Sequence, residues 1–103
     1  MSEGKYTNDG QQRILRVLLA LFSDVVNGVQ PAVLAREVGT SAPNITRDLD
    51  NLATAGLARR MEDTGAWCLT PRLPQQAIKV WTAIDRAEQQ LQQARQRFTR
   101  SPD

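Results

Sequence analysis

The sequence predicts a mainly α-helical fold with one small β-hairpin and a long C-terminal helix, and three features support this prediction. Two helical patterns, residues 31–38 and 42–55, are separated only by Gly39-Thr40-Ser41. Two short strand-like runs follow within residues 57–70, around a polar turn. From residue 74 to about residue 99, helical periodicity continues without a further Gly or Pro. Helix, tight turn, helix and hairpin in this order are typical of a winged helix-turn-helix.

The chain is expected to divide into four segments. Its 103 residues are enough for one small domain with a single core. A polar, disordered leader is expected before that domain and a short tail after the last helix. The predicted segments are the leader 1–8, the winged helix-turn-helix domain 9–73, the C-terminal helix 74–99 and the tail 100–103.

The first helix is expected to run from Asp9 to about Val26. Asp9 and Gln12 have the spacing of a capping box, with Asp in place of the usual Ser or Thr. This helix is apolar over much of its circumference, so it has two apolar stripes. The stripe expected to face the domain core is Ile14, Leu18, Leu21 and Val25. The other stripe, which needs a second partner, is Leu15, Leu19, Phe22 and Val26.

The segment before the third helix has the residue types that a tight turn requires. Gly39 can take the positive φ of a helix C-terminus, and Ser41 can accept hydrogen bonds from the first N–H groups of helix 42–55. Pro43 lies where those N–H groups have no intrahelical partner. The apolar residues expected to bury themselves between the two helices are Leu34, Val38, Ile45, Leu49 and Leu52.

Residues 57–70 are predicted to form the wing. Asn27-Gly28 is a turn signal, and Val29 after it can add a third extended segment to the hairpin. Trp67 either packs into the domain or contacts a sugar-phosphate backbone, and we favour packing because large aromatics in small domains usually join the core. The tip, Glu62-Asp63, is acidic and unsuited to a phosphate contact.

The C-terminal helix carries apolar residues at seven-residue intervals, which is a heptad pattern. The first series is Ala77, Ile84, Leu91 and Phe98, the second is Val80, Ala87 and Ala94, and Ile78 and Trp81 widen the apolar side. This helix either folds back on the first helix of its own chain or pairs with a second chain. We favour a homodimer, because the first helix also has an unpaired stripe. The predicted interface residues are Leu15, Leu19, Phe22, Ala77, Val80, Trp81, Ile84, Leu91 and Phe98.

Composition argues against catalysis and metal binding. The chain has no histidine and one cysteine, Cys68, so the commonest general base and metal ligand are absent, and neither a metal nor another cofactor is expected. Carboxylate pairs occur at Asp48/Asp50 and Glu62/Asp63, on an expected exposed helix face and a turn, so no enzyme is predicted. The lone Cys68 is expected to be a partly buried thiol in a reducing compartment. No apolar run approaches membrane-spanning length and no signal sequence is apparent, which predicts a cytoplasmic protein.

The net charge of +2 is unevenly distributed. Residues 1–56 contain five Lys and Arg against six Asp and Glu, whereas residues 57–103 contain eight against five. Attraction to phosphate is therefore expected mostly from the second half of the chain. Arg59 and Arg60, at the base of the wing, are the preferred contacts there.

Helix 42–55 has polar residues opposite its apolar side. Because Ile45 and Leu49 must point inward, residues 43, 44 and 47 lie on the outward side and Thr46 lies on its flank. Arg can bond guanine O6 and N7, and Asn can bond adenine N6 and N7, both in bidentate fashion. The residues expected to contact double-stranded DNA are Ser41, Pro43, Asn44, Thr46, Arg47, Arg59 and Arg60. Alternatively, Arg47 pairs with a neighbouring acid on a solvated surface.

From Asp9 to Leu73 the sequence resembles the DNA-binding domain of the IclR family of bacterial transcription regulators; MarR-like winged helices share most of the motifs. The matching residues are Leu34-Ala35, Gly39, Ser41, Ile45-Thr46-Arg47, Leu49, Leu52, Gly56-Leu57, Arg60 and Leu69-Thr70-Pro71-Arg72-Leu73. The resemblance implies operator binding, with Ser41 to Arg47 presented to DNA. The family often has a basic residue where Ala42 stands, and its large effector domain would not fit in this chain.

The sequence therefore predicts a dimeric, sequence-specific DNA-binding protein that regulates transcription, with helix 42–55 in the major groove and hairpin 57–70 as the wing. Its regulatory signal would come from a protein partner, a small ligand at the dimer interface or the protein concentration. The alternative is a winged-helix module that binds another protein or only assembles. The alternative gains support from Asp48 and Asp50, which oppose the single cation Arg47 on the third helix. Binding to RNA is a further alternative.

Overall fold

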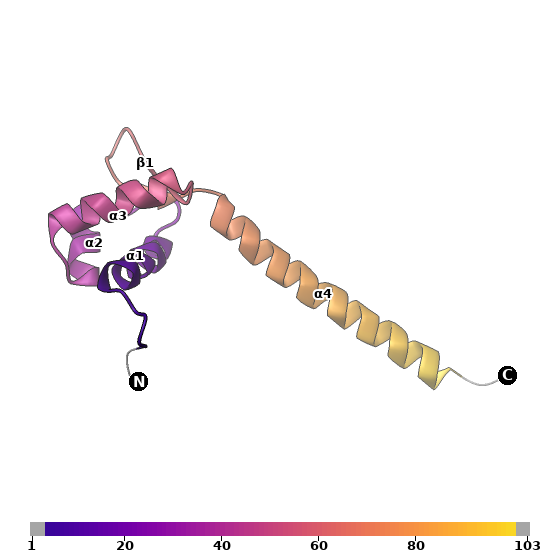
Figure 1. Ribbon diagram of the computed structural model, residues 1–103. Coiled ribbons are helices and arrows are strands. Elements are labelled where there is room, and N and C mark those ends of the chain that lie inside the picture. Colours follow the sequence, from indigo (N-terminus) through magenta and orange to yellow (C-terminus); the bar gives the residue numbers. More distant parts are fainter. Residues whose placement is uncertain (1–3, 101–103) are drawn as a thin grey trace. The chain divides into compact units, whose positions relative to one another are not determined.

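The computed structural model describes residues 4–100, which fall into two units, residues 4–72 and 73–100, each treated separately below. The elements are α1 (Asp9–Ala20), the 3-10 turn η1 (Leu21–Ser23), α2 (Pro31–Val38), α3 (Ala42–Thr54), β1 (Ala58–Arg60), β2 (Trp67–Leu69) and α4 (Arg72–Thr99). The predicted mainly α-helical fold with one hairpin and a long C-terminal helix is confirmed (Figure 1).

Helix α1 begins at Asp9 as predicted, but its capping residue is one position earlier than expected. Asn8, not Asp9, is the capping residue, and its side chain accepts a hydrogen bond from the backbone N–H of Gln11 at 3.0 Å. Asn caps as well as Asp does, and Asp9 then lies in the first turn, where its negative charge suits the helix dipole. Before the helix, Thr7 donates to Gly4 O from both its backbone and its hydroxyl. Part of the predicted leader, residues 1–3, and most of the predicted tail, residues 101–103, lie outside the described residues.

The prediction that α1 continues to Val26 is wrong, because the helix ends at Ala20 and is followed by η1. The carboxylate of Asp24 accepts hydrogen bonds from the backbone N–H groups of Val26 and Asn27, at 3.2 and 2.9 Å. These bonds offer the backbone an alternative to the helix. Gly28 follows with φ 81°, so the predicted turn at Asn27-Gly28 is confirmed.

The core face of α1 also differs from the predicted stripe. Val17 and Leu21 are fully buried, whereas Val25, predicted to be in the core, is 52% exposed because it follows the end of the helix. Ile14 and Leu18 are half-buried. Val17, which was not part of the predicted stripe, is therefore more deeply buried than Ile14 and Leu18, which were.

Helices α1, α2 and α3 contact one another pairwise and enclose the core of residues 4–72 (Figure 1). Gly39 has φ 77°, and the Ser41 side chain accepts from the backbone N–H of Asn44, so both predicted features of the turn are confirmed. Helix α3 begins at Ala42 despite the following Pro43. The buried apolar residues are Val17, Leu21, Val29, Leu34, Ile45, Leu49, Leu52, Ala58, Ala66, Cys68 and Leu69. Val38 is half-buried.

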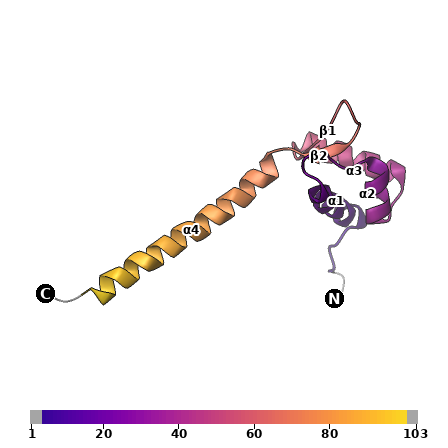
Figure 2. The same cartoon turned by 180° about the vertical axis from the view of Figure 1, so that it is seen from behind.

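The wing is a two-stranded antiparallel hairpin to which Val29 adds a single bridge. Strands β1 and β2 lie side by side (Figure 2), with Ala58 paired to Leu69 and Arg60 to Trp67. Val29 bridges to the other side of Trp67, so the predicted third extended segment is confirmed. The side chain of Gln30 also reaches the wing loop, where it donates to the carbonyl of Thr64 at 3.0 Å. These bonds fix the hairpin against the segment that leads into α2.

Helix α4 begins at Arg72, two residues before the predicted start. Pro74 is its third residue, where a missing N–H costs no intrahelical hydrogen bond. No residue of Arg72–Thr99, all of it within the described part of the chain, is buried. Among residues 4–100, no helix is long and apolar enough to cross a membrane.

Candidate nucleic-acid interface

The N-terminal half of α3 presents most of the predicted contact residues on one exposed surface. Ser41, Pro43, Thr46 and Arg47 are exposed and Asn44 is half-buried. Ile45 on the opposite side is fully buried, which fixes the rotation of the helix about its axis. The structure therefore brings these five residues together at one end of α3; below, they are called the α3 surface.

Two hydrogen bonds order the side chains at the centre of the α3 surface. The Asn44 amide donates to Thr40 Oγ1 at 3.0 Å and accepts from Arg47 Nη1 at 3.3 Å. Thr46 Oγ1 donates to the carbonyl of Ala42 at 3.1 Å. Arg47 has five N–H donors and uses one of them here, so its remaining donors can bond a base edge or a phosphate. Among residues 4–100, no ion pair involves Arg47, so it does not pair with a neighbouring acid.

Asp48 is not on an exposed helix face, and that prediction is wrong. It is 4% exposed, and Arg13 of α1 donates to both of its carboxylate oxygens, at 2.7 and 3.0 Å. The hydrogen bond to Asp48 raises the pKa of Arg13, although partial burial of the guanidinium lowers it. A buried carboxylate needs such a partner, since an unpaired buried charge is costly. Sequence reasoning missed this pair because its members are 35 residues apart.

Asp50 differs from Asp48 because it stays exposed. It lies three residues after Arg47, on the same outward side of α3 and one turn further from the helix N-terminus. Of these two acids, one is neutralised in the core and the other remains on the outward side.

The two arginines at the base of the wing are exposed but have different surroundings. Successive residues of a strand point to opposite faces, so Arg59 and Arg60 do not present their charges to the same side. Arg60 Nη1 lies 3.7 Å from Glu62 Oε2, in an exposed ion pair that contributes little to stability but offsets the charge. Arg59 is in no ion pair among residues 4–100. Of these two arginines, Arg59 is therefore the one whose charge no acid offsets among residues 4–100.

Thr70 and Arg72 position the end of α3, a role that sequence reasoning did not assign to them. Arg72 Nη1 donates to the carbonyl of Ala55 at 3.0 Å, and Thr70 Oγ1 donates to the carbonyl of Gly56 at 2.6 Å. These carbonyls follow the last turn of α3, where they have no intrahelical partners. The signal available in the sequence was a Thr and an Arg directly after the second strand.

Trp67 and Cys68 both pack against the rest of the winged domain, which is the alternative favoured for Trp67 from the sequence. Trp67 is half-buried between β1 and Val29, and Cys68 is buried as a free thiol, which is deeper than the predicted partial burial.

Among residues 4–100, no three His, Cys, Asp or Glu side chains lie close enough together to hold a metal ion.

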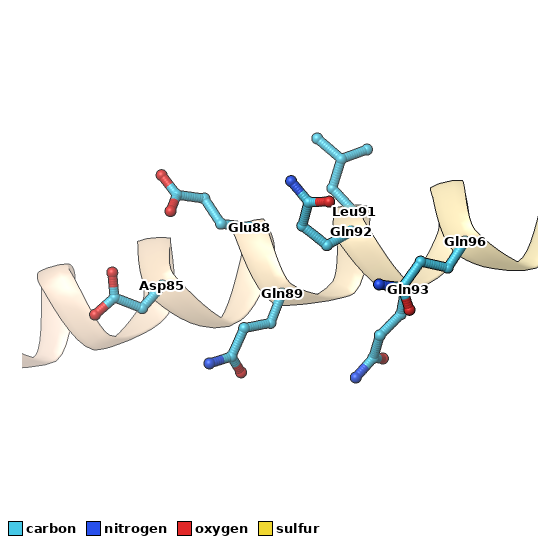
Figure 3. Close-up of a pocket in the computed structure, with 7 residues that line it drawn as sticks. All are labelled: Asp85, Glu88, Gln89, Leu91, Gln92, Gln93 and Gln96. Carbon is cyan, nitrogen blue, oxygen red and sulfur yellow. The ribbon is translucent and has the colours of Figure 1, made fainter.

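The residues predicted for dimerisation are exposed in both units. On α1 and η1, Leu19 is 69% exposed, and Leu15 and Phe22 are about half exposed. On α4, the large apolar side chains range from 42% exposed at Ile84 to 80% at Phe98. Figure 3 shows a shallow hollow among seven side chains of α4, Asp85, Glu88, Gln89, Leu91, Gln92, Gln93 and Gln96. All seven belong to one helix, so the hollow has no opposite wall that could enclose a ligand.

Comparison with known proteins identifies the fold. No family model and no curated protein matches the sequence. A solved structure of ORF112-Zalpha from Cyprinid Herpesvirus 3, concerned with its binding mode to Z-DNA, matches with a TM-score of 0.52 and 20% sequence identity. The match covers 58% of this chain and 95% of that one. At this identity the likeness shows the fold alone, so the chain contains a winged helix, and the resemblance to the IclR family stays a prediction.

Proposed function

We propose that this protein binds double-stranded DNA, with the α3 surface in the major groove and the wing beside it, and that it regulates transcription as a cytoplasmic homodimer. The observation that carries the proposal is the α3 surface itself. Its Arg47 and Asn44 are ordered by a shared hydrogen bond. Ser41, Pro43, Thr46 and Arg47 are exposed, so a groove can reach them. The winged-helix neighbour, which binds Z-DNA, gives the fold a precedent for contact with DNA.

The pairing of Asp48 with Arg13 supports the DNA proposal over a protein-binding module. The alternative rested on two acids opposing Arg47, and one of them is neutralised by Arg13 behind the helix. Only Asp50 then repels phosphate from the outward side of α3. It can also accept a hydrogen bond from cytosine N4, so its presence is compatible with base recognition.

The resemblance to the IclR family gives the proposal its specific form, a regulator that binds an operator with two half-sites. Dimerisation is supported by apolar side chains left exposed on both α1 and α4, among them Leu19, Ile84 and Leu91. Sedimentation at tens of micromolar tests it directly. We expect a dimer for the unmodified chain and a monomer after Ile84→Lys with Leu91→Lys.

A binding experiment with selected DNA tests the groove contact. Duplexes are selected from a random pool, and their affinities are measured for the unmodified chain, Asn44→Ala and Arg47→Ala. Arg47 is exposed, so Arg47→Ala should change folding by at most ~0.5 kcal/mol, while it should cost about 1–3 kcal/mol of discrimination at one base pair. Asn44 is half-buried and bonded to Thr40, so the folding of Asn44→Ala is measured beside its affinity. Arg16→Ala is the matched control, because Arg16 is an exposed arginine of α1, which packs against the inward side of α3. Native affinity and selectivity in both variants would remove α3 as the reading helix.

The salt dependence and the form of the DNA provide two further readouts. A dimer that uses Arg47, Arg59 and one or two more cations per half-site would neutralise roughly six to eight phosphates, so its affinity should fall on the order of 10³-fold between about 50 and 200 mM salt. If the affinity for DNA does not change with salt concentration and no duplex is selected from the random pool, the protein-binding module is favoured. A brominated CG-repeat duplex held in the left-handed form belongs in the same series. Preference for it over every right-handed duplex would mean recognition of DNA form instead of sequence.

A further inference from the structure

From residue 84 to residue 98, the apolar side of α4 has its large residues in one heptad series and its small residues in the other. The first heptad series contains the large side chains Ile84, Leu91 and Phe98, whereas the second contains Val80 and the two alanines Ala87 and Ala94. All of these residues lie on α4, and none of them is buried. The order of these sizes along the helix determines how well a second helix fits against it.

A parallel, in-register pair would place identical residues opposite each other. The layers at Ala87 and Ala94 would then contain only methyl groups, while the layers at Leu91 and Phe98 would contain two large side chains each. Helices at constant separation cannot fill both kinds of layer well, because well-packed cores set large residues against small ones. An antiparallel pair gives a different result. Leu91 then faces the partner's Ala87, and Ile84 faces the partner's Ala94.

The same antiparallel register places Phe98 opposite the partner's Val80, so every one of the six central layers combines one larger and one smaller residue. The arginines near the C-terminal end of α4 favour this arrangement as well. Arg95 and Arg97 lie in the last two turns of α4 and Arg100 follows the helix directly, and the sequence has no acid between Glu88 and Arg100. A parallel pair would bring six arginines together at one end, whereas an antiparallel pair separates them and sets Arg95 beside the partner's Trp81, where a cation–π contact is available.

We propose that α4 pairs with α4 of a second copy of this chain in antiparallel orientation, with the two-fold axis close to Gln89. This inference deepens the proposed dimer by specifying its partner surface and orientation. Each helix contributes Val80, Trp81, Ile84, Leu91 and Phe98, which are 42–80% exposed. Covering about 100 Å² on each of these ten side chains amounts to roughly 1,000 Å². With the alanine and glutamine stems added, the pair reaches about 1,200 Å², the lower limit for a specific interface.

Variants with one added cysteine distinguish the two orientations. Glu88→Cys places a thiol beside the two-fold axis of the antiparallel pair, so it should link to its own copy, whereas in a parallel pair the two positions lie on opposite sides. Ala77→Cys has the reverse behaviour, since a parallel pair sets the two thiols in one core layer and an antiparallel pair separates them by about 36 Å along the axis. Asp85→Cys is the matched control, because it is exposed on the same helix but lies away from the apolar side. The unmodified chain is the second control, since its Cys68 is buried.

The variants are oxidised as purified full-length chains at tens of micromolar without DNA, and covalent dimers are quantified by non-reducing electrophoresis. We expect Glu88→Cys to link at least about tenfold faster than Asp85→Cys, while Ala77→Cys links no faster than this control. Faster linking of Ala77→Cys than of Glu88→Cys overturns the proposed orientation. If neither exceeds the control and the unmodified chain sediments as a monomer, a second copy is not the partner of α4. Because DNA is absent, these results stand apart from the Arg47→Ala binding experiment, and failure of either leaves the other interpretable.

Discussion

Replacement of Asp48 by alanine should destabilise the winged-helix unit much more than replacement of a neighbouring acid. Asp48 is 4% exposed and receives two hydrogen bonds from Arg13, so its removal leaves a guanidinium without its partner. Loss of one member of a buried pair costs about 3–5 kcal/mol. The Arg13 side chain keeps 21% of its surface in water, which relieves part of this cost. We therefore expect a loss of about 2–4 kcal/mol for Asp48→Ala, a large share of the ~5–15 kcal/mol that stabilises a typical domain.

Thermal unfolding at neutral pH, followed by far-ultraviolet circular dichroism, measures this difference. A loss of that size corresponds to a fall in Tm of about 10–25 °C in a domain of 60–100 residues. Asp50→Ala is the matched control, because it removes an exposed carboxylate from the same helix and should change stability by at most ~0.5 kcal/mol. Equal effects of the two substitutions would refute the structural role assigned to the Arg13–Asp48 pair.

Replacing both Arg13 and Asp48 by apolar residues distinguishes two effects. One is the cost of leaving a single charge unpaired, and the other is the net contribution of the ion pair to stability. Well-packed apolar residues often substitute for a buried ion pair without loss of stability. Arg13→Met combined with Asp48→Leu should therefore recover most of the stability that Asp48→Ala loses. If the double variant is as unstable as Asp48→Ala, the two side chains contribute through packing geometry and not through charge neutralisation.

The remaining predictions concern the turns of the winged domain. Gly39→Ala should cost only the ~1–2 kcal/mol of a left-handed residue, since no atom lies within 4 Å of the new Cβ. Gly28→Ala should cost clearly more in denaturant unfolding, because its Cβ would lie 2.8 Å from the carbonyl oxygen of Trp67; equal losses would contradict this. Hydrogen bonds from the backbone and side-chain N–H groups of Asn27 and the backbone N–H of Val26 lower the pKa of Asp24. Its contribution to stability is thus present above about pH 4, the pKa of an unfolded aspartate, and is lost as the pH falls through the lower folded pKa. Asp24→Ala should therefore lose less stability than the unmodified chain between pH 4 and pH 2, and parallel pH profiles would exclude this role.

Local residue chemistry was enough to predict the order of the elements and the turn within the winged helix. Gly39 takes a positive φ and Ser41 caps α3, both as predicted, because each needs only its own backbone and the next few residues. The grouping of the candidate contact residues at the start of α3 was also predictable. Helical geometry places them on one side once Ile45 is known to be buried.

The end of α1 shows where local reasoning was misled. The apolar pattern continues through Val25 and Val26, and periodicity alone extended the helix over both. The side chain of Asp24 instead bonds the backbone ahead of it, and the chain turns at Gly28 so that Val29 can pair with Trp67. The position of Val29 depends on a strand nearly forty residues later, and no periodicity within α1 contains that information.

The charge of the candidate interface was decided by tertiary structure. In sequence, Asp48 and Asp50 are equivalent acids that flank Leu49 on one helix. The packing of α1 against α3 brings Arg13 to one of them and leaves the other in water. Tertiary structure also places Arg72 at the end of α3, where one of its N–H groups donates to the carbonyl of Ala55. Sequence by itself determined which residues are charged and which helix carries them. The packed helices decided which of those charges face solvent, since a buried charge persists only where a distant side chain of opposite sign reaches it.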